Sequence, residues 1–298
     1  MLRNMSQIVQ AAKERPSIRM VVASAADPTV LEAVIRGAKD NLAEPILVGD
    51  KDKIEGIAKE KGFSLSQCEI EDIKDPIEAS RKAVQITSNG EAHLLMKGLV
   101  SSADLLREVL NKDYGLRKGG ILSHVALFDL PLTEKLCILT DGGMCPYPDL
   151  NAKVAIIENA MEVMLKLGHE MPLIAPIAAV EVVNPDMPNT MDDAILTQMN
   201  RRGQIKGCII DGPLGLDNAI SIKAAEHKGI KSDVAGRADI LLVPDIQVGN
   251  ILYKSIAFIA NLDTACVIAG AKAPIILTSR ADDEQVKYLS IAFAVLCA

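Results

Sequence analysis

The residues best suited to anion binding or proton transfer stand in three short turns in the last third of the chain. These turns are Asp211-Gly212, Asp245 and Ser279-Arg280. Each follows an apolar run rich in β-branched residues, at 208–210, 240–243 and 275–277. Such bounded runs are typical of parallel strands that are covered on both faces. Because ligands of open α/β sheets bind outside the carboxyl ends of the strands, we expect the three turns to contribute to one pocket.

A second candidate anion site follows the apolar run that ends at Lys97-Gly98. The polar residues at 101–104 suit the cap of a helix that continues to about 111. Free backbone N–H groups converge at such a helix start, and Lys97 and Ser102 would lie beside them. Arg107, one turn further along, could reach the same anion. The alternative is ordinary helix capping beside solvated cations.

The elements that must position these residues alternate in the first part of the chain. Strand-like segments at 19–24 and 45–49 are each followed by a helical pattern, which is the signature of a parallel sheet built from βαβ units. Strand-like segments at 119–129 and 135–140 are instead joined by a short connection, which predicts a β-hairpin. This change of topology places a domain boundary near residue 125.

Composition narrows the class of protein. A chain of 298 residues exceeds the usual size of one hydrophobic core, so two domains are expected. No Trp, few other aromatic residues and a net charge of -7 exclude a general nucleic-acid surface. Six Cys without a C-x-x-C pair indicate free thiols in a reducing compartment. No signal peptide or membrane-length apolar run is found, so we expect a cytoplasmic protein with no membrane partner.

Missing motifs remove further classes. The sequence has neither the G-x-G-x-x-G of dinucleotide sites nor a Walker A loop, and neither H-E-x-x-H nor G-x-S-x-G occurs. Only four His are present, and His124 stands in an apolar strand that is typical of a core histidine. We therefore expect no metal site. What remains is a set of anion-friendly turns with a Ser-Arg pair and several Asp.

These motifs together resemble the phosphate acetyl/butyryltransferase family, and the resemblance covers nearly the whole chain. The resembling segments are 97–98, 102–107, 122–125, 211–214, 217–219, 228–232, 238–245, 249–254 and 279–280. The chain length, the Asp211-Gly-Pro-Leu form and Ser123-His124 point to the phosphate butyryltransferase branch.

The resemblance implies an α/β fold of two α/β/α domains with mostly parallel sheets and an interdomain cleft that holds the active site. The isocitrate and isopropylmalate dehydrogenases share that architecture. The first domain would comprise 1–125 plus 283–298, and the second 126–282. The implied reaction is reversible transfer of a short acyl group between coenzyme A and inorganic phosphate. Coenzyme A would be a substrate, with no tightly bound cofactor. The apolar composition and two-domain build favour a homodimer or larger homo-oligomer.

The resemblance also implies roles for single residues. Ser279 would stabilise the transition state, and Arg280 would bind phosphate or the acyl phosphate. Ser102 and Arg107 match the family's phosphate-side residues, and Lys97 belongs to the same segment. The general base is left open between Asp283 and Asp282, and a direct thiolate route without a base is also possible. A further set shapes the cleft or only caps helices and forms turns: Asp211, Asn218, Asn250 and Lys254.

Other functions remain as alternatives at this point. A phosphate acetyltransferase would use the same chemistry on a shorter acyl group. An oxidative decarboxylase of the dehydrogenase architecture would need clustered Asp for a metal, and fold analogy is weak support for function. A non-catalytic acyl-CoA-binding paralogue is a third possibility. The preferred acyl chain does not follow from the sequence, because one methylene changes discrimination by only ~1–3 kcal/mol.

Overall fold

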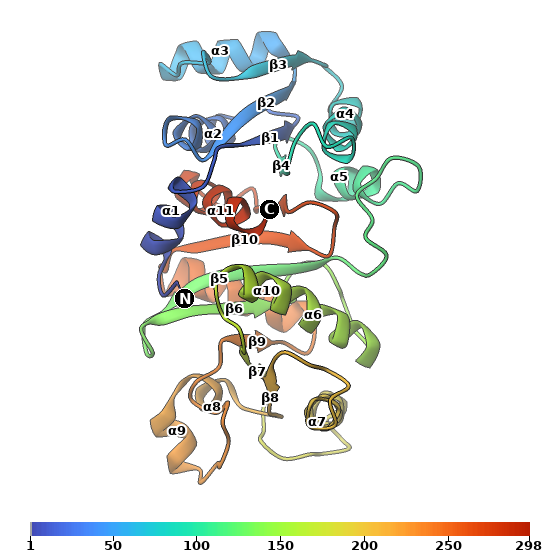
Figure 1. The fold of residues 1–298 in the computed structure, drawn as a ribbon, viewed down its shortest axis with the longest axis vertical. Coiled ribbons are helices and arrows are strands. Elements are labelled where there is room, and N and C mark those ends of the chain that lie inside the picture. Colours follow the sequence, from blue (N-terminus) through green and yellow to red (C-terminus); the bar gives the residue numbers. More distant parts are fainter. Residues whose placement is uncertain (1) are drawn as a thin grey trace. The chain divides into compact units, whose positions relative to one another are not determined.

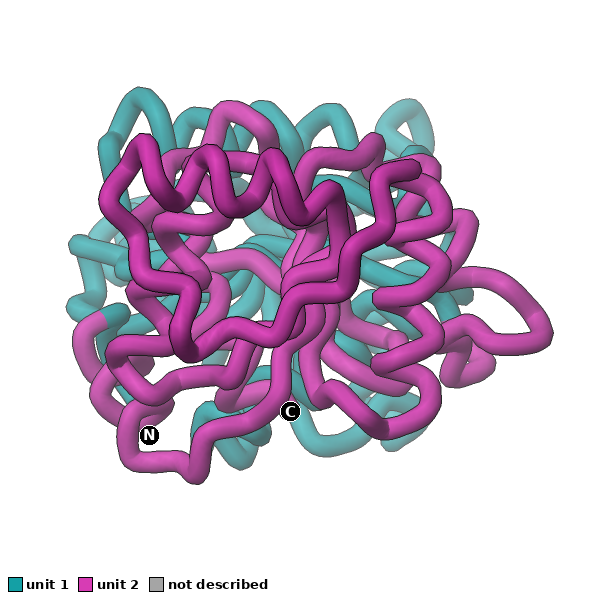
Figure 2. Tube along the Cα trace, turned by 90° about the horizontal axis from the view of Figure 1, so that it is seen from above, with its two compact units in different colours: residues 1–5, 121–264 teal, residues 6–120, 265–298 magenta. Residues whose placement is uncertain are grey.

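A computed structural model describes residues 2–298 of the chain, and it has the mixed α/β class expected from the sequence (Figure 1). The chain divides into two compact units, which Figure 2 distinguishes by colour. Unit 1 comprises residues 2–5 and 121–264, and unit 2 comprises residues 6–120 and 265–298. Unit 2 is therefore built from two separate stretches of the chain, and most of unit 1 lies between them in the sequence.

The sheet of unit 2 has the strand order β3-β2-β1-β4-β11-β10. Its strands are β1 (Ile18–Ala23), β2 (Ala43–Gly49), β3 (Glu69–Asp72), β4 (Leu94–Lys97), β10 (Thr264–Ala269) and β11 (Ile275–Ile276). All neighbours are parallel except β10 and β11. The helices of this part are α1 (Met5–Lys13), α2 (Pro28–Lys39), α3 (Lys51–Lys61), α4 (Pro76–Ser88), α5 (Ser102–Val109) and α11 (Glu284–Cys297).

Helices α2, α3 and α4 of unit 2 begin at aspartates that cap free backbone N–H groups. Asp27 accepts the N–H of Val30 at the start of α2, and a proline fills the first helical position there. Asp50 and Asp75 cap α3 and α4 in the same way. Asp and Asn are preferred caps because their side-chain oxygen satisfies an N–H that has no partner within the helix. The helical pattern expected after the segment at 19–24 is confirmed, and it begins at Asp27-Pro28.

Helix α11 supplies a large part of the core of unit 2. All residues from Tyr288 to Cys297 are buried, and Phe293 is completely so. The helix packs on α2 at Gly37, where an added Cβ would meet Ile291 at 3.5 Å. Arg36 of α2 also stacks over the Tyr288 ring, with its guanidinium carbon 3.7 Å from the ring centroid. The close approach of the two helices fixes the start of α11 near the carboxyl ends of β4 and β11.

The sheet of unit 1 has the strand order β5-β6-β9-β7-β8. Its strands are β5 (Ser123–Leu130), β6 (Lys135–Thr140), β7 (Leu173–Pro176), β8 (Ile209–Ile210) and β9 (Ile240–Leu242). β5 and β6 pair antiparallel, which confirms the predicted hairpin, and the remaining neighbours are parallel. The helices are α6 (Leu150–Lys166), α7 (Pro188–Arg201), α8 (Leu216–Ile220), α9 (Ile222–His227), α10 (Ile246–Lys254) and the π-helix η1 (Ser255–Ile259).

The compact units and the predicted domains have different second boundaries, and the domain bounds stay a prediction. The sequence interpretation kept residues up to 282 in the second domain, whereas β11 and nearly all of β10 lie in unit 2. The physical reason is strand pairing, because Ile275 and Ile276 pair with Leu95 and Met96 of β4. The first boundary, at 121, lies close to the expected position near 125.

Candidate active site

The turn Ser279-Arg280 follows β11 and is held by the side chain of a nearby aspartate. Asp282 accepts the backbone N–H of Ser279 through Oδ2 at 2.7 Å, and Asp282 is buried. Ser279 Oγ accepts the N–H of Ala281 at 3.3 Å. These bonds fix a tight turn in which the Ser279 side chain is half-buried and the Arg280 side chain is exposed.

The turn Lys97-Gly98 follows β4, the parallel neighbour of β11. Gly98 donates its N–H to the carbonyl of Ala23, and Leu99 donates to that of Ser24. An added Cβ at Gly98 would lie 2.2 Å from the Ser24 oxygen, so only glycine fits this close approach of two backbones. The Lys97 ammonium is buried and donates to the carbonyls of Gly98 and Val100 at 3.2 and 3.3 Å.

The two turns line one small cavity of unit 2. It has a volume of about 90 Å³ and lies at the carboxyl ends of β1, β4 and β11. The lining residues are Asp27, Thr29, Val30, Lys97, Gly98, Leu99, Thr278, Ser279, Arg280 and Lys287. Pockets for drug-sized ligands occupy roughly 300–1,000 Å³, so this volume suits a small ion or group. The location is the one that open α/β sheets use for ligands.

Positive charge dominates the lining of this cavity. Burial lowers the pKa of Lys97, and the nearby charge of Arg280 lowers it further. Burial also lowers the pKa of Lys287. Within residues 2–298, none of these three cations forms a salt bridge with a carboxylate. Asp27 contributes the one lining carboxylate, and that group already caps α2. A small anion would relieve the mutual repulsion of the cations.

Ser102 and Arg107 lie on α5 of the same unit but do not line the cavity. Ser101, rather than Ser102, is the N-cap, and it accepts the N–H of Asp104 at 3.0 Å. Arg107 pairs with Asp104 at 2.7 Å, and its side chain is 66% exposed. The phosphate role of Ser102 and Arg107 stays a prediction.

The two candidate bases both have structural partners. Asp283 is the N-cap of α11 and accepts the N–H of Val286 at 2.9 Å. Asp282 holds the Ser279 turn through its carboxylate, and its backbone carbonyl accepts a hydrogen bond from the Lys287 ammonium. The structure thus gives each carboxylate a positioning contact, and neither lines the cavity. Their role as general base stays a prediction.

The remaining predicted residues lie in unit 1. Asp211 pairs with Arg201 at 3.1 Å. Asn218 is completely buried and donates to Glu181, which also pairs with Lys228. The three turns of the sequence analysis are therefore divided, with Asp211 and Asp245 in unit 1 and Ser279-Arg280 in unit 2. Their contribution to one pocket stays a prediction.

Asn250 and Lys254 lie on α10 beside the loop that follows β6. Asn250 donates to the carbonyl of Gly142 at 3.4 Å, and the Lys254 ammonium lies 5.8 Å from the Phe258 ring centroid. His124 of β5 is buried near the same loop, and its ring meets Tyr253 edge-on with centroids 5.7 Å apart. Burial lowers the pKa of His124, and its Nδ1 has no partner among the described residues.

Unit 1 contains a larger and more apolar cavity of about 660 Å³. It lies at the carboxyl ends of β7 and β9, and Asp245 is among its lining residues. Its other lining residues include Tyr147, Ile177, Met187, Pro188 and Val248. The buried Lys153 at its edge is already paired with Asp192 at 2.8 Å. This cavity therefore carries no unpaired cation for a phosphate.

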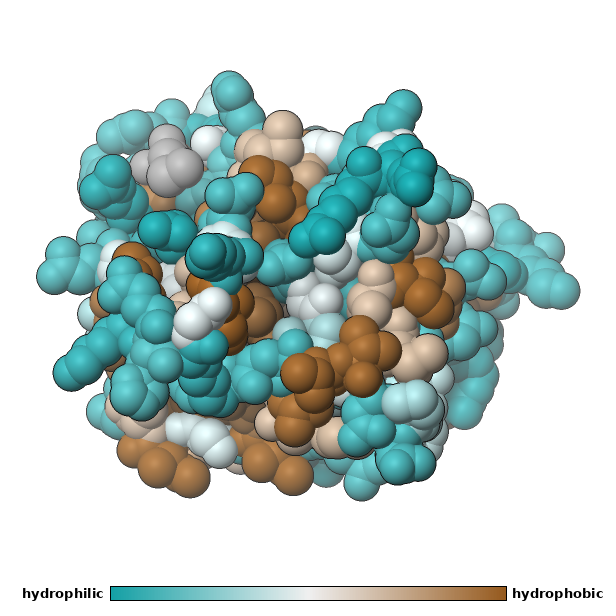
Figure 3. All heavy atoms as spheres, turned by 90° about the horizontal axis from the view of Figure 1, so that it is seen from below, coloured by the Kyte–Doolittle hydropathy of each residue, from teal (hydrophilic) through white to brown (hydrophobic). Residues whose placement is uncertain are grey.

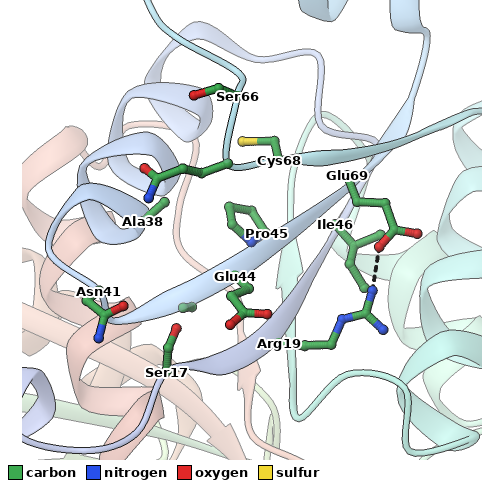
Figure 4. Close-up of a pocket in the computed structure, with 12 residues that line it drawn as sticks. Ser17, Arg19, Ala38, Asn41, Glu44, Pro45, Ile46, Ser66, Cys68 and Glu69 are labelled. Atoms are coloured by element: carbon green, nitrogen blue, oxygen red, sulfur yellow. Dashed lines mark hydrogen bonds and ion pairs between the residues drawn. The ribbon is translucent and has the colours of Figure 1, made fainter.

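Another cavity of unit 2, of about 500 Å³, lies at the opposite ends of the strands. Figure 4 shows its residues around the starts of β1, β2 and β3, with Arg19 turned toward Glu69. Arg19 also donates to the carbonyl of Glu91. Because Glu69 neutralises the charge of Arg19, this cavity is a weaker candidate for an anion site than the one beside Ser279.

Sequence reasoning missed Asp27 and Lys287 as lining residues of the Ser279 cavity. In the sequence Asp27 is typical of a helix cap, which it also is. Lys287 stands at the start of an apolar segment that favours a buried helix. The available signal was the position of a lysine within that otherwise apolar segment, because a charged group on a buried helix face needs a partner.

Comparison with known proteins identifies the chain. The profile described as phosphate acetyl/butaryl transferase matches residues 4–83 and 77–295. The chain belongs to this family. A phosphate butyryltransferase of Clostridium beijerinckii is 48% identical over all of this chain and 99% of its own length. A phosphate acetyltransferase of Thermotoga maritima is 44% identical over 99% of each chain. Members of the phosphate acetyl/butaryl transferase family are acyltransferases, and this chain is therefore an enzyme of that class.

Solved structures agree with this assignment. A branched-chain phosphotransacylase of Enterococcus faecalis matches with a TM-score of 0.84 and 33% identity, over 94% of this chain and 99% of its own. A 4-hydroxythreonine-4-phosphate dehydrogenase of Salmonella typhimurium matches with a TM-score of 0.60 and 12% identity, which shows a shared fold only. The predicted dehydrogenase-like architecture of the phosphate acetyl/butaryl transferase family is thus confirmed.

Residues 2–298 lack two features, a cluster of metal ligands and a membrane-spanning helix. No group of three or more His, Cys, Asp or Glu is arranged to hold a metal ion. No helix combines the length and hydrophobicity that a membrane span requires.

Proposed function

We propose that this enzyme transfers a short acyl group, butyryl or of similar size, reversibly between coenzyme A and inorganic phosphate. The phosphate, or the phosphoryl group of the acyl phosphate, binds in the cavity lined by Ser279 and Arg280. The observation that carries this proposal is the set of cations without carboxylate partners around a cavity of about 90 Å³. That cavity is large enough for a small anion and too small for coenzyme A.

In the forward reaction a phosphate oxygen attacks the thioester carbonyl, the C–S bond breaks, and coenzyme A leaves as a thiolate that takes up a proton. Arg280 binds the phosphate, since a guanidinium can donate two parallel hydrogen bonds to it. Lys97 adds a second positive charge from the opposite turn. Ser279 donates its hydroxyl to the oxyanion that develops on the carbonyl. These charges and donors stabilise the transition state more than the separated substrates.

The general base is proposed for the reverse direction, in which the thiol of coenzyme A must lose a proton. A free thiol has a pKa of roughly 8–9, so a base accelerates the step near neutral pH. Asp283 and Asp282 remain the candidates, and a direct attack by the thiolate is the alternative. Ser102, Arg107, Asp211, Asn218, Asn250 and Lys254 are proposed to contact the rest of the substrates.

The experiment measures phosphate-dependent release of coenzyme A from acetyl-, propionyl-, butyryl- and isobutyryl-CoA, with a chelator and without nucleotide. We expect the highest kcat/KM with a four-carbon acyl group. Ser279→Ala and Arg280→Ala should each lower kcat/KM by about 10²–10³-fold, the usual effect of removing a transition-state donor. Ser66→Ala, an exposed serine of the same unit, is the matched control.

Two results would change the proposal. A peak with acetyl-CoA would make the enzyme a phosphate acetyltransferase, as the name of the Thermotoga maritima relative suggests for that protein. No phosphate-dependent release from any substrate would refute the transferase proposal and leave the non-catalytic acyl-CoA-binding paralogue.

We further propose a cytoplasmic homo-oligomer whose small-molecule partners are acyl-CoA and phosphate. The six free cysteines support a reducing compartment. Side chains of α10 and η1 support self-association, because Ile251, Phe258 and Ile259 are 67%, 55% and 83% exposed. Hydrophobic residues also gather in patches on the face drawn in Figure 3. Light scattering after size-exclusion chromatography tests the assembly, and a monomer at micromolar concentration would contradict it.

A further inference from the structure

Lys287 occupies an unusual position for a lysine. It lies on α11, where the ten residues that follow it are all buried, and only 4% of its own surface is exposed. Lysine is almost never fully buried unless its charge is compensated. Carboxylates act on Lys287 from nearby, but none forms a salt bridge with it within residues 2–298, so there is room for a further anionic partner.

The ammonium group of Lys287 has more N–H donors than it has hydrogen bonds within the described residues. Its ammonium donates to the backbone carbonyl of Asp282, and that is its one hydrogen bond within the described residues. An ammonium has three donors and no acceptor, so two N–H groups remain for a further partner. Burial lowers the pKa of Lys287, and the carboxylates of Asp282, Asp27 and Asp283 oppose that shift. An anion that accepted the remaining N–H groups would favour the charged form in the same way.

The surroundings of Lys287 indicate which anion this is. Lys287 lines the small cavity together with Ser279, Arg280 and Lys97. Lys97 lines the cavity from the end of β4, whereas Lys287 lines it from the first turn of α11. The two ammonium groups and the guanidinium thus approach one volume from three segments of the chain. That arrangement suits an oxyanion with several equivalent oxygens, such as phosphate.

We propose that Lys287 is a further ligand of the phosphate substrate and of the phosphoryl group of the acyl phosphate. The proposal rests on the assignment of the cavity as the phosphate site. Lys287 holds phosphate oxygens while another oxygen attacks the thioester carbonyl, and it neutralises charge on the phosphoryl group. The bond to Asp282 orients the ammonium, because Asp282 also holds the N–H of Ser279.

The first test is binding of inorganic phosphate, measured as the rise in melting temperature of the full chain. We expect phosphate to raise the melting temperature of the wild type, with potassium chloride at equal ionic strength as reference. Lys287→Met should lose at least four-fifths of this rise, and Lys287→Arg should keep most of it. Lys59→Met replaces an exposed lysine on α3 and should behave as the wild type.

The second test separates substrate binding from a merely structural role. Lys287→Met should raise the KM for phosphate by at least tenfold and leave the KM for acyl-CoA within twofold. A lysine that only supported the Ser279 turn would lower kcat, change both KM values together and leave the phosphate-induced shift intact. That pattern would overturn the proposal. If Lys287→Met does not fold, Lys287→Gln keeps two N–H donors without the charge, and the same criteria apply to it.

Failure of the acyl transfer proposal can be distinguished from failure of the Lys287 proposal. A wild type that releases no coenzyme A in the presence of phosphate contradicts the acyl transfer proposal. If phosphate still raises its melting temperature and Lys287→Met abolishes that rise, Lys287 remains a phosphate ligand. An equal rise in wild type and Lys287→Met would refute the role of Lys287 even in an active transferase.

Discussion

The carboxylate of Asp282 accepts the backbone N–H of Ser279 at 2.7 Å, three residues earlier in the chain. This bond closes the turn that presents the Ser279 hydroxyl, and Asp282 is itself 5% exposed. Through this contact Asp282 positions Ser279. Substitutions of Asp282 can therefore distinguish a positioning role from a role in proton transfer.

We predict that Asp282→Asn and Asp282→Ala differ in activity. The amide oxygen of Asn still accepts the Ser279 N–H, so kcat should fall by less than about tenfold. Ala removes the acceptor, and the loosened turn should cost about 100-fold, the effect expected of a small misplacement of a reacting group. Steady-state release of coenzyme A from butyryl-CoA measures both. An equal collapse in the two variants would instead indicate that Asp282 transfers a proton.

We predict that Gly98→Ala disrupts both stability and the phosphate site. The new Cβ would meet the backbone oxygens of Ser24 and Ala23 at 2.2 and 2.7 Å, and backbone atoms cannot give way as a flexible side chain can. We expect a loss of about 1–3 kcal/mol and a higher KM for phosphate, because Lys97 moves with the turn. Gly56→Ala is the control, since that site on α3 is open and Ala favours a helix by roughly 0.5–1 kcal/mol. Urea unfolding of both variants gives the comparison, and equal stability would argue against the close contact.

We predict that the ionisation of Asp193 lowers the stability of the folded protein as the pH rises from about 4 to about 7. Burial raises the pKa of Asp193 to about 7, and its Oδ2 has no partner among the described residues. The folded state therefore binds more protons than the unfolded state in this interval, and stability falls as the pH increases. The free energy of unfolding of Asp193→Asn, relative to that of the wild type, should therefore increase by roughly 2–4 kcal/mol from pH 4 to pH 8. Urea midpoints at the two pH values test this, and a constant difference would contradict it.

We predict the opposite dependence for His124. Burial lowers its pKa, so the unfolded state binds the proton more tightly and stability is lost as the pH falls below about 6.5. The one charge that opposes this shift is that of Asp141. His124→Phe keeps an aromatic edge against Tyr253 and cannot be protonated. Its stability relative to the wild type should improve between pH 7.5 and pH 5, measured by thermal unfolding. No change in the difference would show that His124 binds its proton equally well in the folded and unfolded states, and would contradict the prediction.

Local patterns in the sequence predicted much of the fold. The capping Asp27 and the turn between Leu130 and Lys135 are signals that lie within a few residues of the elements they define. The second boundary between the units was not predictable in this way. It depends on the pairing of Ile275 with Leu95, two residues that are distant in sequence and carry no local mark of their partner.

In the candidate site, too, local sequence signals were informative and long-range packing was not predictable. Ser279, Arg280 and Lys97 were singled out because each follows an apolar strand at its carboxyl end, and all three line one cavity. Lys287 was missed because its distance from Ser279 depends on how α11 packs against α2. Ser102 and Arg107 were predicted from the helix start that follows Lys97-Gly98 and from the family resemblance. In the structure Ser101 caps this helix and Arg107 pairs with Asp104.

Unit 2 consists of two stretches that are far apart in the sequence, which affects how it forms during synthesis on the ribosome. β4 pairs with β1 early, but its other edge is completed only by β11. Until residues 275–276 have left the exit tunnel, β4 presents an open edge of backbone N–H and C=O groups, which invites pairing with other chains. Ser279, Arg280 and Lys287 emerge later still. The nascent enzyme therefore lacks the cavity beside Ser279 until residues 279–287 have been released, and chaperones that cover strand edges would be needed most during that interval.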